Sequence, residues 1–157
     1  MLKSRDFDAS QLAIGIIAAV TVFFMTRGIT NAMVRSTTYQ NIGEALYGQG
    51  QVDQAEEYYL KAKGIWPASA GLNTSLGRIR FEQHRYAEAA ELFGESVKQS
   101  PSFVEAHLGY GSSLLATGDI DGAEREFRAA LQLNPSSAAA LGGLEDVQQA
   151  RRLRMSR

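Results

Sequence analysis

Apolar residues follow two different patterns along the chain. Residues 12–25 read LAIGIIAAVTVFFM and contain a single polar residue, Thr21, within an uncharged stretch that covers residues 9–26. From residue 36 onward, apolar residues recur at helical spacings and not at alternate positions. The pattern therefore predicts one continuous apolar helix followed by a series of amphipathic helices.

The amphipathic region repeats itself every 34 residues. Pro67, Pro101 and Pro135 are the only prolines in the chain, and both intervals between them are 34 residues. When the segments are aligned on these prolines, position 8 is always glycine, position 20 always alanine and position 24 always aromatic. The aligned segments are residues 36–69, 70–103 and 104–137. The residues at the three positions are Gly43, Gly77 and Gly111, then Ala55, Ala89 and Ala123, then Tyr59, Phe93 and Phe127.

Each segment is interpreted as a pair of antiparallel helices. Small residues at positions 8 and 20 let the two backbones approach closely, and the bulky ring at position 24 fills the space beside that contact. Gly50 and Gly118 at position 15 can adopt the positive φ of a turn between helices. Each proline ends the second helix, since proline cannot continue one. One hairpin cannot bury its apolar face alone, so the hairpins are expected to stack.

This repeat strongly resembles the tetratricopeptide repeat family. The second segment departs most from the family pattern, because Arg80 occupies a position where an apolar residue is expected and His84 replaces the glycine of the turn. The resemblance covers residues 36–137 and implies an all-α fold in which three helical hairpins form a right-handed α-solenoid. The third segment is the most similar, through Tyr110-Gly111, Gly118-Asp119, Ala123, Phe127 and Leu133-Asn134-Pro135.

Residues 9–26 are long enough to cross the hydrocarbon core of a membrane, spanning about 27 Å as a helix. A single transmembrane anchor is the favoured interpretation, and a cleaved signal peptide and a buried core helix are the alternatives. Asp6 and Asp8 argue against a signal peptide, which prefers a positively charged leader. Gly15 and Ala19 form a small pair, four residues apart, at which a second membrane helix can pack. The flanking charges are balanced, and the N-terminal amine alone favours repeats outside the cytoplasm, as in a bacterial inner-membrane protein.

The helix predicted after the last repeat resembles the capping helix of tetratricopeptide arrays. Its apolar stripe comprises Leu141, Leu144 and Val147. The expected organisation is an N-terminal flank (1–8), a transmembrane helix (9–26), a linker (27–35), the three repeats (36–137), the capping helix (138–152) and a basic tail (153–157).

The charges are divided unevenly along the chain. Residues 36–150 carry eight basic and fifteen acidic side chains, whereas the last seven residues hold four arginines. An acidic body repels phosphate groups, which argues against a nucleic-acid-binding domain. The chain has no cysteine, which excludes disulfides, thiolate nucleophiles and cysteine-ligated metals and leaves oxidising and reducing compartments open.

The family resemblance implies that partners bind in a concave groove lined by the first helix of each repeat. Tyr47, Phe81 and Leu115 form an apolar series along this groove, which suits an extended peptide or an amphipathic helix with apolar anchors. Packing against adjacent repeats is the alternative role for these side chains. The candidate groove residues are Gln40, Glu44, Tyr47, Thr74, Arg78, Phe81, Glu105, Leu108, Ser112 and Leu115.

One class of groove ligand is disfavoured by the residues present. Tetratricopeptide proteins that hold the acidic C-terminus of heat-shock chaperones use a clamp of lysine, asparagine and arginine. The corresponding positions here offer Gln40, Glu44, Glu105 and Gly109, and Arg78 alone does not make a clamp. The sequence therefore argues against a ligand that ends in a carboxylate.

Enzyme chemistry is not expected. His107 stands at a packing position of its repeat and His84 in an inter-helix turn, and neither is paired with a serine or carboxylate at a catalytic spacing. Gly109-Tyr110-Gly111 imitates the start of a nucleotide-binding loop, but it lies within a helix and lacks the preceding strand. No metal site and no cofactor are predicted.

Taken together, these patterns predict a membrane-anchored scaffold or assembly factor that recruits a protein partner of a membrane complex in its groove. The alternative is a permanent accessory subunit of such a complex, held mainly by its transmembrane helix. Self-association through stacked repeats is a third hypothesis. Contact with lipid is expected along residues 9–26.

Overall fold

The computed structural model describes the backbone of residues 9–156 and the side chains of residues 22–156. Within this range the chain forms seven α-helices and no strand, so the predicted all-α solenoid is confirmed. The helices are α1 (Ala9–Gly48), α2 (Val52–Ile65), α3 (Ala70–Glu82), α4 (Tyr86–Gln99), α5 (Val104–Thr117), α6 (Ile120–Leu133) and α7 (Ala138–Met155).

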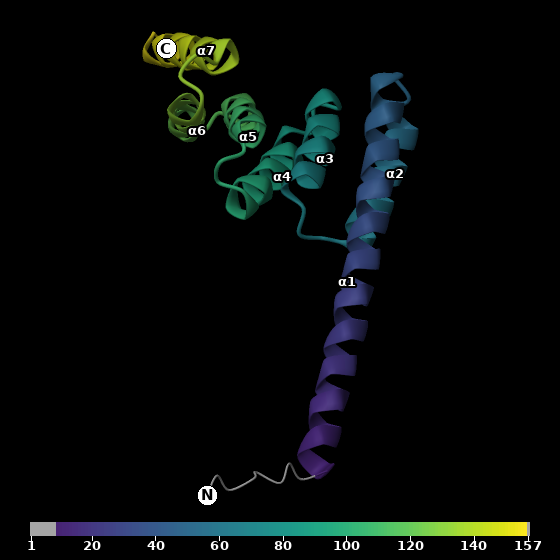
Figure 1. Ribbon diagram of the computed structural model, residues 1–157. Helices are drawn as coiled ribbons and strands as arrows, with labels where there is room; N and C mark the ends of the chain where they lie inside the picture. The colour runs from purple at the N-terminus through teal and green to yellow at the C-terminus, as the bar shows by residue number, and fades with distance from the viewer. Residues whose placement is uncertain (1–8, 157) are drawn as a thin grey trace, which may run out of the picture.

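The first six helices pair into three antiparallel hairpins that follow one another along the chain, and α7 packs on the last of them (Figure 1). Gly50 and Gly118 have φ values of 77° and 91° in the turns of the first and third hairpins, as the sequence predicted. His84 takes the same left-handed conformation in the second turn, with φ 59°. Its Nδ1 lies 2.7 Å from the Tyr86 hydroxyl, a hydrogen bond that holds the side chain over the start of α4.

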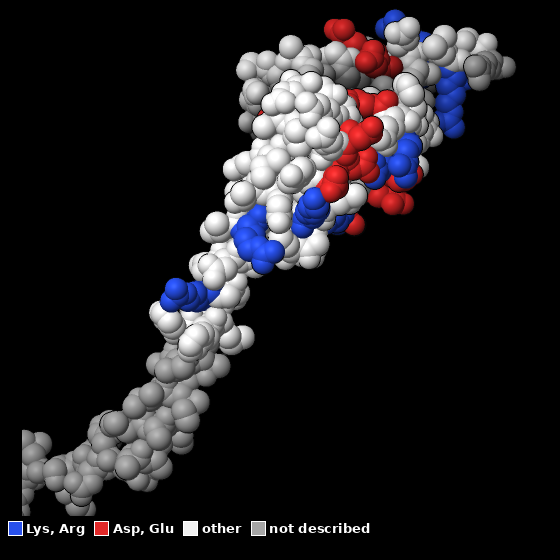
Figure 2. Space-filling model, turned by 90° about the vertical axis from the view of Figure 1, so that its right-hand side faces the viewer, with Lys and Arg blue, Asp and Glu red and all other residues white. Residues whose placement is uncertain are grey.

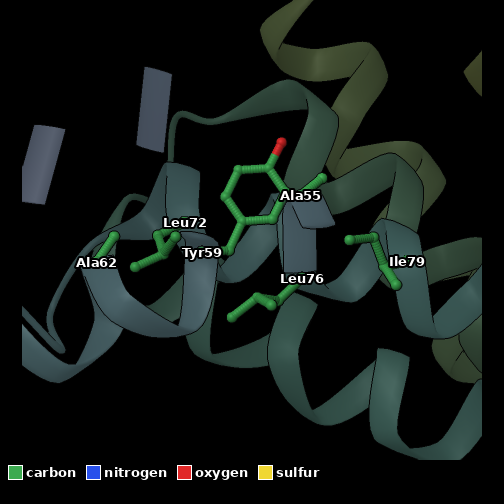
Figure 3. Packing of buried hydrophobic residues seen from close by; sticks show 6 residues of the cluster. All are labelled: Ala55, Tyr59, Ala62, Leu72, Leu76 and Ile79. Atoms are coloured by element: carbon green, nitrogen blue, oxygen red, sulfur yellow. The ribbon is translucent and has the colours of Figure 1, made fainter. Parts of the chain in front are cut away.

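The aromatic residue of each repeat lies at the centre of the core. Figure 3 shows Tyr59 of α2 among small and branched apolar side chains of α2 and α3. Phe93 and Phe127 are 4% and 3% exposed in the next two hairpins, so the repeat alignment correctly identified the buried ring. The other labelled members of the first cluster are Ala55, Ala62, Leu72, Leu76 and Ile79.

Glycine backbones pack directly against the two phenylalanine rings. A Cβ at Gly77 would lie 3.1 Å from the Phe93 ring, and a Cβ at Gly109 on the next repeat 2.3 Å from it. The Phe127 ring has the same arrangement, with Gly111 of its own repeat and Gly143 of α7. Each ring is thus enclosed between the first helix of its own hairpin and the first helix of the following one.

The capping helix α7 continues the repeat register. Gly143 follows Gly109 by 34 residues, and both contact the ring of the preceding repeat. Val147 is 1% exposed, whereas Leu141, which the sequence placed on the same apolar stripe, is 49% exposed. The helix also extends to Met155, so residues 153–155 of the expected basic tail are helical.

The linker expected at residues 27–35 is helical and continuous with the rest of α1. The next residue, Ser36, is buried against α2, and its Oγ donates a hydrogen bond to the Ala62 carbonyl oxygen at 3.1 Å. Residues 22–35, called the stem below, project beyond the hairpin (Figure 1) and form a largely uncharged surface in Figure 2. The large apolar side chains exposed on the stem are Val22, Phe23, Phe24, Met25, Ile29, Met33 and Val34.

No helix among the residues with described side chains is both long and apolar enough to span a membrane. The transmembrane segment was predicted at residues 9–26, and most of it lies outside that range, as do the side chains of Gly15 and Ala19. The N-terminal flank, residues 1–8, lies outside the described residues altogether. These assignments therefore stay predictions.

Candidate partner-binding groove

Two adjoining cavities lie along the first helices of the later repeats. The first has a volume of about 310 Å³ between α3 and α5. The second, of about 440 Å³, lies between α5 and α7. Phe81 and Ser112 line both cavities, so the two form one continuous groove. The candidate residues that line the first are Thr74, Arg78, Phe81, Glu105, Leu108 and Ser112, and Leu115 lines the second.

Phe81 occupies the middle of the groove. Its ring lies 5.1 Å from that of Tyr86, centroid to centroid, in an edge-to-face arrangement that the two rings favour electrostatically. Leu108 and Leu115 of α5 are half-buried, as Phe81 is, so each presents apolar surface to the groove while its base packs on the core. The three side chains together provide apolar anchoring surface between α3 and α7.

The candidate residues on α1 do not line these cavities. Gln40 lies in a separate small hollow beside the α2–α3 connection, together with Trp66 and Ser69. Glu44 and Tyr47 instead bind residues of α3. The structure thus brings seven of the ten candidates together and places the three from the first repeat elsewhere.

A polar cluster joins α1 to α3; it consists of Glu44, Tyr47, Ser75, Arg78 and Glu82. Arg78 Nη2 donates to Glu44 Oε2 at 3.1 Å, and its guanidinium carbon lies 4.0 Å from the centroid of the Tyr47 ring, a cation–π contact. Ser75 Oγ donates to the other oxygen of Glu44, and the Tyr47 hydroxyl donates to Glu82. Arg78 is therefore already paired within the protein.

The polar cluster shifts the pKa values of its members. Burial raises the pKa of Tyr47 to about 12, assisted by the neighbouring Glu82 carboxylate. Burial acts in the same direction on the carboxyl of Glu44, but the hydrogen bond from Ser75 and the positive charge of Arg78 outweigh it. The pKa of Glu44 is therefore below its usual value of 4.5. At neutral pH the cluster holds a carboxylate at Glu44 and a neutral phenol at Tyr47.

Sequence reasoning missed the contribution of α7 to the groove. Ala139, Gly142 and Asp146 line the second cavity. They occupy positions 2, 5 and 9 when the 34-residue numbering is continued from residue 138. Three groove candidates of the third repeat, Glu105, Leu108 and Ser112, occupy these same positions. Continuing the register into the capping helix would have identified all three.

The two histidines have structural roles. His107 is 6% exposed, and its Nδ1 and Nε2 lie 2.8 Å from Glu126 Oε2 and 2.9 Å from the Pro101 carbonyl oxygen. The imidazole therefore ties the start of α5 to α6 and to the loop before α5. No group of three or more potential metal ligands occurs in the part of the chain that the structure describes.

Comparison with family models and curated proteins identifies similar sequences. Two models described as tetratricopeptide repeat match residues 36–68 and 74–138. The chain is 31% identical over 103 residues to human "DnaJ homolog subfamily C member 7", an alignment that covers 66% of this chain and 21% of that protein. The chain thus spans about a fifth of the length of the curated relatives it matches.

Solved structures show the same fold at low sequence identity. The first tetratricopeptide domain of Spaghetti (RPAP3), solved with an HSP90 peptide SRMEEVD, superposes with a TM-score of 0.72 at 22% identity. That match covers 75% of this chain and 94% of the other. The tetratricopeptide domain of Arabidopsis OM64 has a TM-score of 0.71 at 21% identity, with 75% and 98% of the two chains covered.

Proposed function

The chain belongs to the tetratricopeptide repeat family, and on that basis we propose that it recruits a protein partner by holding a peptide or helix of that partner between α3, α5 and α7. The observation that carries the proposal is the continuous groove, with Phe81 at its centre and apolar side chains along it. Domains of the same fold include one solved with a bound peptide, which makes peptide binding the first activity to test.

We further propose that residues 9–26 hold the protein on a membrane, so that it acts as a scaffold or assembly factor for a membrane complex. Two observations support this. The uncharged segment leads without a break into the helix that forms the first hairpin, and the stem, which overlaps the end of that segment, exposes large apolar side chains. Confinement to a membrane would raise the effective concentration of the groove for partners in the same bilayer.

The groove is tested by partner capture from detergent-solubilised membranes. Substituting Phe81→Glu together with Leu115→Glu places two charges on the apolar anchors and should remove captured partners. Leu60→Glu with Leu133→Glu is the matched control, because these leucines are 50% and 42% exposed on α2 and α6 and line neither groove cavity. Helix content by circular dichroism, together with the single variant Leu115→Glu, separates lost binding from lost folding. Capture that survives in folded variants would exclude the groove as the binding site.

The anchor is tested in the full chain with Ile17→Arg, which places a charge in the middle of the apolar segment. A central arginine disfavours membrane insertion by about 2.5–3.5 kcal/mol. The variant should move from the membrane fraction to the supernatant after carbonate washing, whereas Ile17→Leu should not. An unchanged distribution of the arginine variant would exclude this anchor.

The exposed stem supports a second function, that of a permanent accessory subunit held through α1. Its exposed apolar side chains offer a surface on which another helix can pack without any use of the groove. In that case a stoichiometric complex would survive the Phe81→Glu, Leu115→Glu substitutions and dissociate when the stem is made polar.

A further inference from the structure

The groove carries unpaired negative charge at both ends of its apolar centre. Glu105 lines the cavity between α3 and α5, and Asp146 lines the cavity between α5 and α7. Within residues 22–156, neither carboxylate lies within 4.0 Å of a basic nitrogen. Both are exposed side chains, so both are accessible to a ligand.

The basic side chain of the groove does not offset these carboxylates. Arg78 is the one cation that lines the two cavities, and it is held by Glu44 and by the ring of Tyr47. Glu82 adds a further carboxylate on the α1 side of Arg78, where it accepts a hydrogen bond from the Tyr47 hydroxyl. An incoming carboxylate would have to displace Glu44 from Arg78 and approach several like charges, which raises its energy.

Large apolar side chains contribute to the lining of both cavities. Phe81 is shared by both cavities, Leu108 lines the first and Leu115 the second. Gly142 carries no side chain over the floor of the second cavity, and a Cβ there would meet nothing within 4 Å, which leaves room for a large side chain of a ligand. Each cavity therefore combines apolar surface with one exposed carboxylate, and the two cavities share Phe81.

Building on the proposed function, we propose that the groove selects a basic amphipathic segment: large apolar side chains placed between lysines or arginines. The apolar side chains bind against Phe81, Leu108 and Leu115, and the flanking cations pair with Glu105 and Asp146. The similar solved domain was bound to an acidic peptide, SRMEEVD. The segment proposed here carries the opposite charge, so acidic and basic peptides can be compared directly on this chain. Charge selects the partner, and the buried apolar surface provides most of the affinity.

The proposal is tested with three fluorescent peptides of equal length that share a central Leu-Leu-Phe and differ only in their flanking residues. The flanks are lysine, serine or glutamate, and binding to the full chain in detergent is followed by fluorescence anisotropy at low and high salt. The lysine peptide should bind tightest and the glutamate peptide weakest. The advantage of lysine should shrink at high salt, because salt screens exposed charge pairs.

Variants of the chain assign the preference to the two carboxylates. Glu105→Gln with Asp146→Asn should weaken binding of the lysine peptide by about threefold to tenfold, the range for two exposed ion pairs. The serine peptide should bind as before. Glu91→Gln is the matched control, since it removes an exposed carboxylate of α4 that faces a hollow beside α2 and not the groove.

The outcomes separate this inference from the proposed function. If the glutamate peptide binds as well as the lysine peptide, and Phe81→Glu with Leu115→Glu abolishes both, the charge preference is wrong and the groove function stands. If the lysine peptide binds equally well to the Phe81→Glu, Leu115→Glu variant, the groove itself is not the binding site. If the lysine peptide does not bind the unmodified chain, the inference is overturned, and partner capture then decides the proposed function independently.

Discussion

Gly142 and Gly143 are neighbours in α7 with opposite surroundings. A Cβ at Gly143 would lie 2.5 Å from the Phe127 ring, and that ring is only 3% exposed and cannot swing away. A Cβ at Gly142 would meet nothing within 4 Å. The same substitution at the two positions therefore isolates the effect of packing from the effect of helix propensity.

We predict that Gly143→Ala lowers the free energy of unfolding by about 1–3 kcal/mol, the usual range for overpacking a core. Gly142→Ala should raise it by about 0.4–1 kcal/mol, because alanine loses less backbone freedom on folding than glycine does. Urea denaturation of the two variants measures both changes. Equal effects of the two substitutions would mean that α7 does not sit against Phe127 as described.

At the level of single residues, the sequence predicted the buried positions of each repeat well. The aromatic ring, the alanine and the glycine of each repeat were identified from periodicity alone, because a 34-residue period in register constrains every copy at once. The backbone conformation of His84 was harder to predict from the sequence. Its position indicated a turn, but the left-handed φ of a residue with a Cβ depends on local hydrogen bonding with Tyr86, which periodicity does not encode.

The helix junctions differ in how they are held together. Glycine backbones enclose Phe93 and Phe127 at the two later junctions, whereas Ser75 stands at the corresponding position of the first. At that junction polar contacts add to the apolar packing of Tyr59 against α3. Glu44 joins α1 to α3 through Arg78, and Glu56 joins α2 to α3 through Arg80 at 2.5 Å.

Arg80 thus has a structural explanation. The sequence marked it as a departure from the repeat, and the structure shows its guanidinium bound to Glu56 of α2 and 3.6 Å from Glu88 of α4. The identity of its partners was not predictable, because a charge at a nominally apolar position can equally be solvated. The same limit applied to Arg78, which was predicted as a groove residue and is paired with Glu44.

The first junction should therefore weaken in acid. The pKa of Glu44 and that of Glu56 are both lowered in the folded chain, Glu44 by Ser75 and Arg78 against its burial and Glu56 chiefly by the hydrogen bond from Arg80. Below the usual value of 4.5 the unfolded chain binds more protons than the folded one, so the stabilisation is present above that pH and is lost as pH falls through the lowered folded values.

We predict that Glu44→Gln with Glu56→Gln is less stable than the unmodified chain at neutral pH, and that this difference shrinks as pH falls below about 4. Thermal unfolding monitored by circular dichroism over that range measures it. Glu145→Gln serves as the control, since it removes an exposed carboxylate of α7, which takes no part in the first junction. A stability difference that is constant with pH would show that these carboxylates are not held in ion pairs.

The whole molecule consists of a solenoid and an apolar projection. The repeats bury their apolar faces against one another, whereas the stem leaves Phe24 and Val34 exposed at 68% and 64%. Thr26 and Thr30 in the stem donate their hydroxyl hydrogens to carbonyl oxygens of the same helix. These two hydroxyls therefore need no hydrogen-bond partner outside the helix.

The organisation of the repeats followed from the sequence, but the form of their connection to the apolar segment did not. A linker was expected at residues 27–35, which include Arg27, Gly28 and Asn31, with continuation of the apolar helix through it as one possibility. The structure continues α1 through them, since none of these residues prevents helical backbone geometry and no proline occurs before Pro67. The first hairpin is therefore built on a helix that is continuous with the proposed anchor.

This arrangement predicts that the stem governs association with detergent or lipid independently of the repeats. Phe24→Ser with Val34→Ser should change the free energy of unfolding by no more than about 0.5 kcal/mol, because both side chains are exposed. The variant should nevertheless bind fewer detergent molecules and partition less into neutral vesicles, since less apolar surface remains to be covered. Leu60→Ser with Leu133→Ser removes exposed apolar surface from the repeats and should leave both measurements unchanged. If the two variants behave alike, detergent covers apolar surface wherever it is exposed, and the stem has no special part in holding this protein at a membrane.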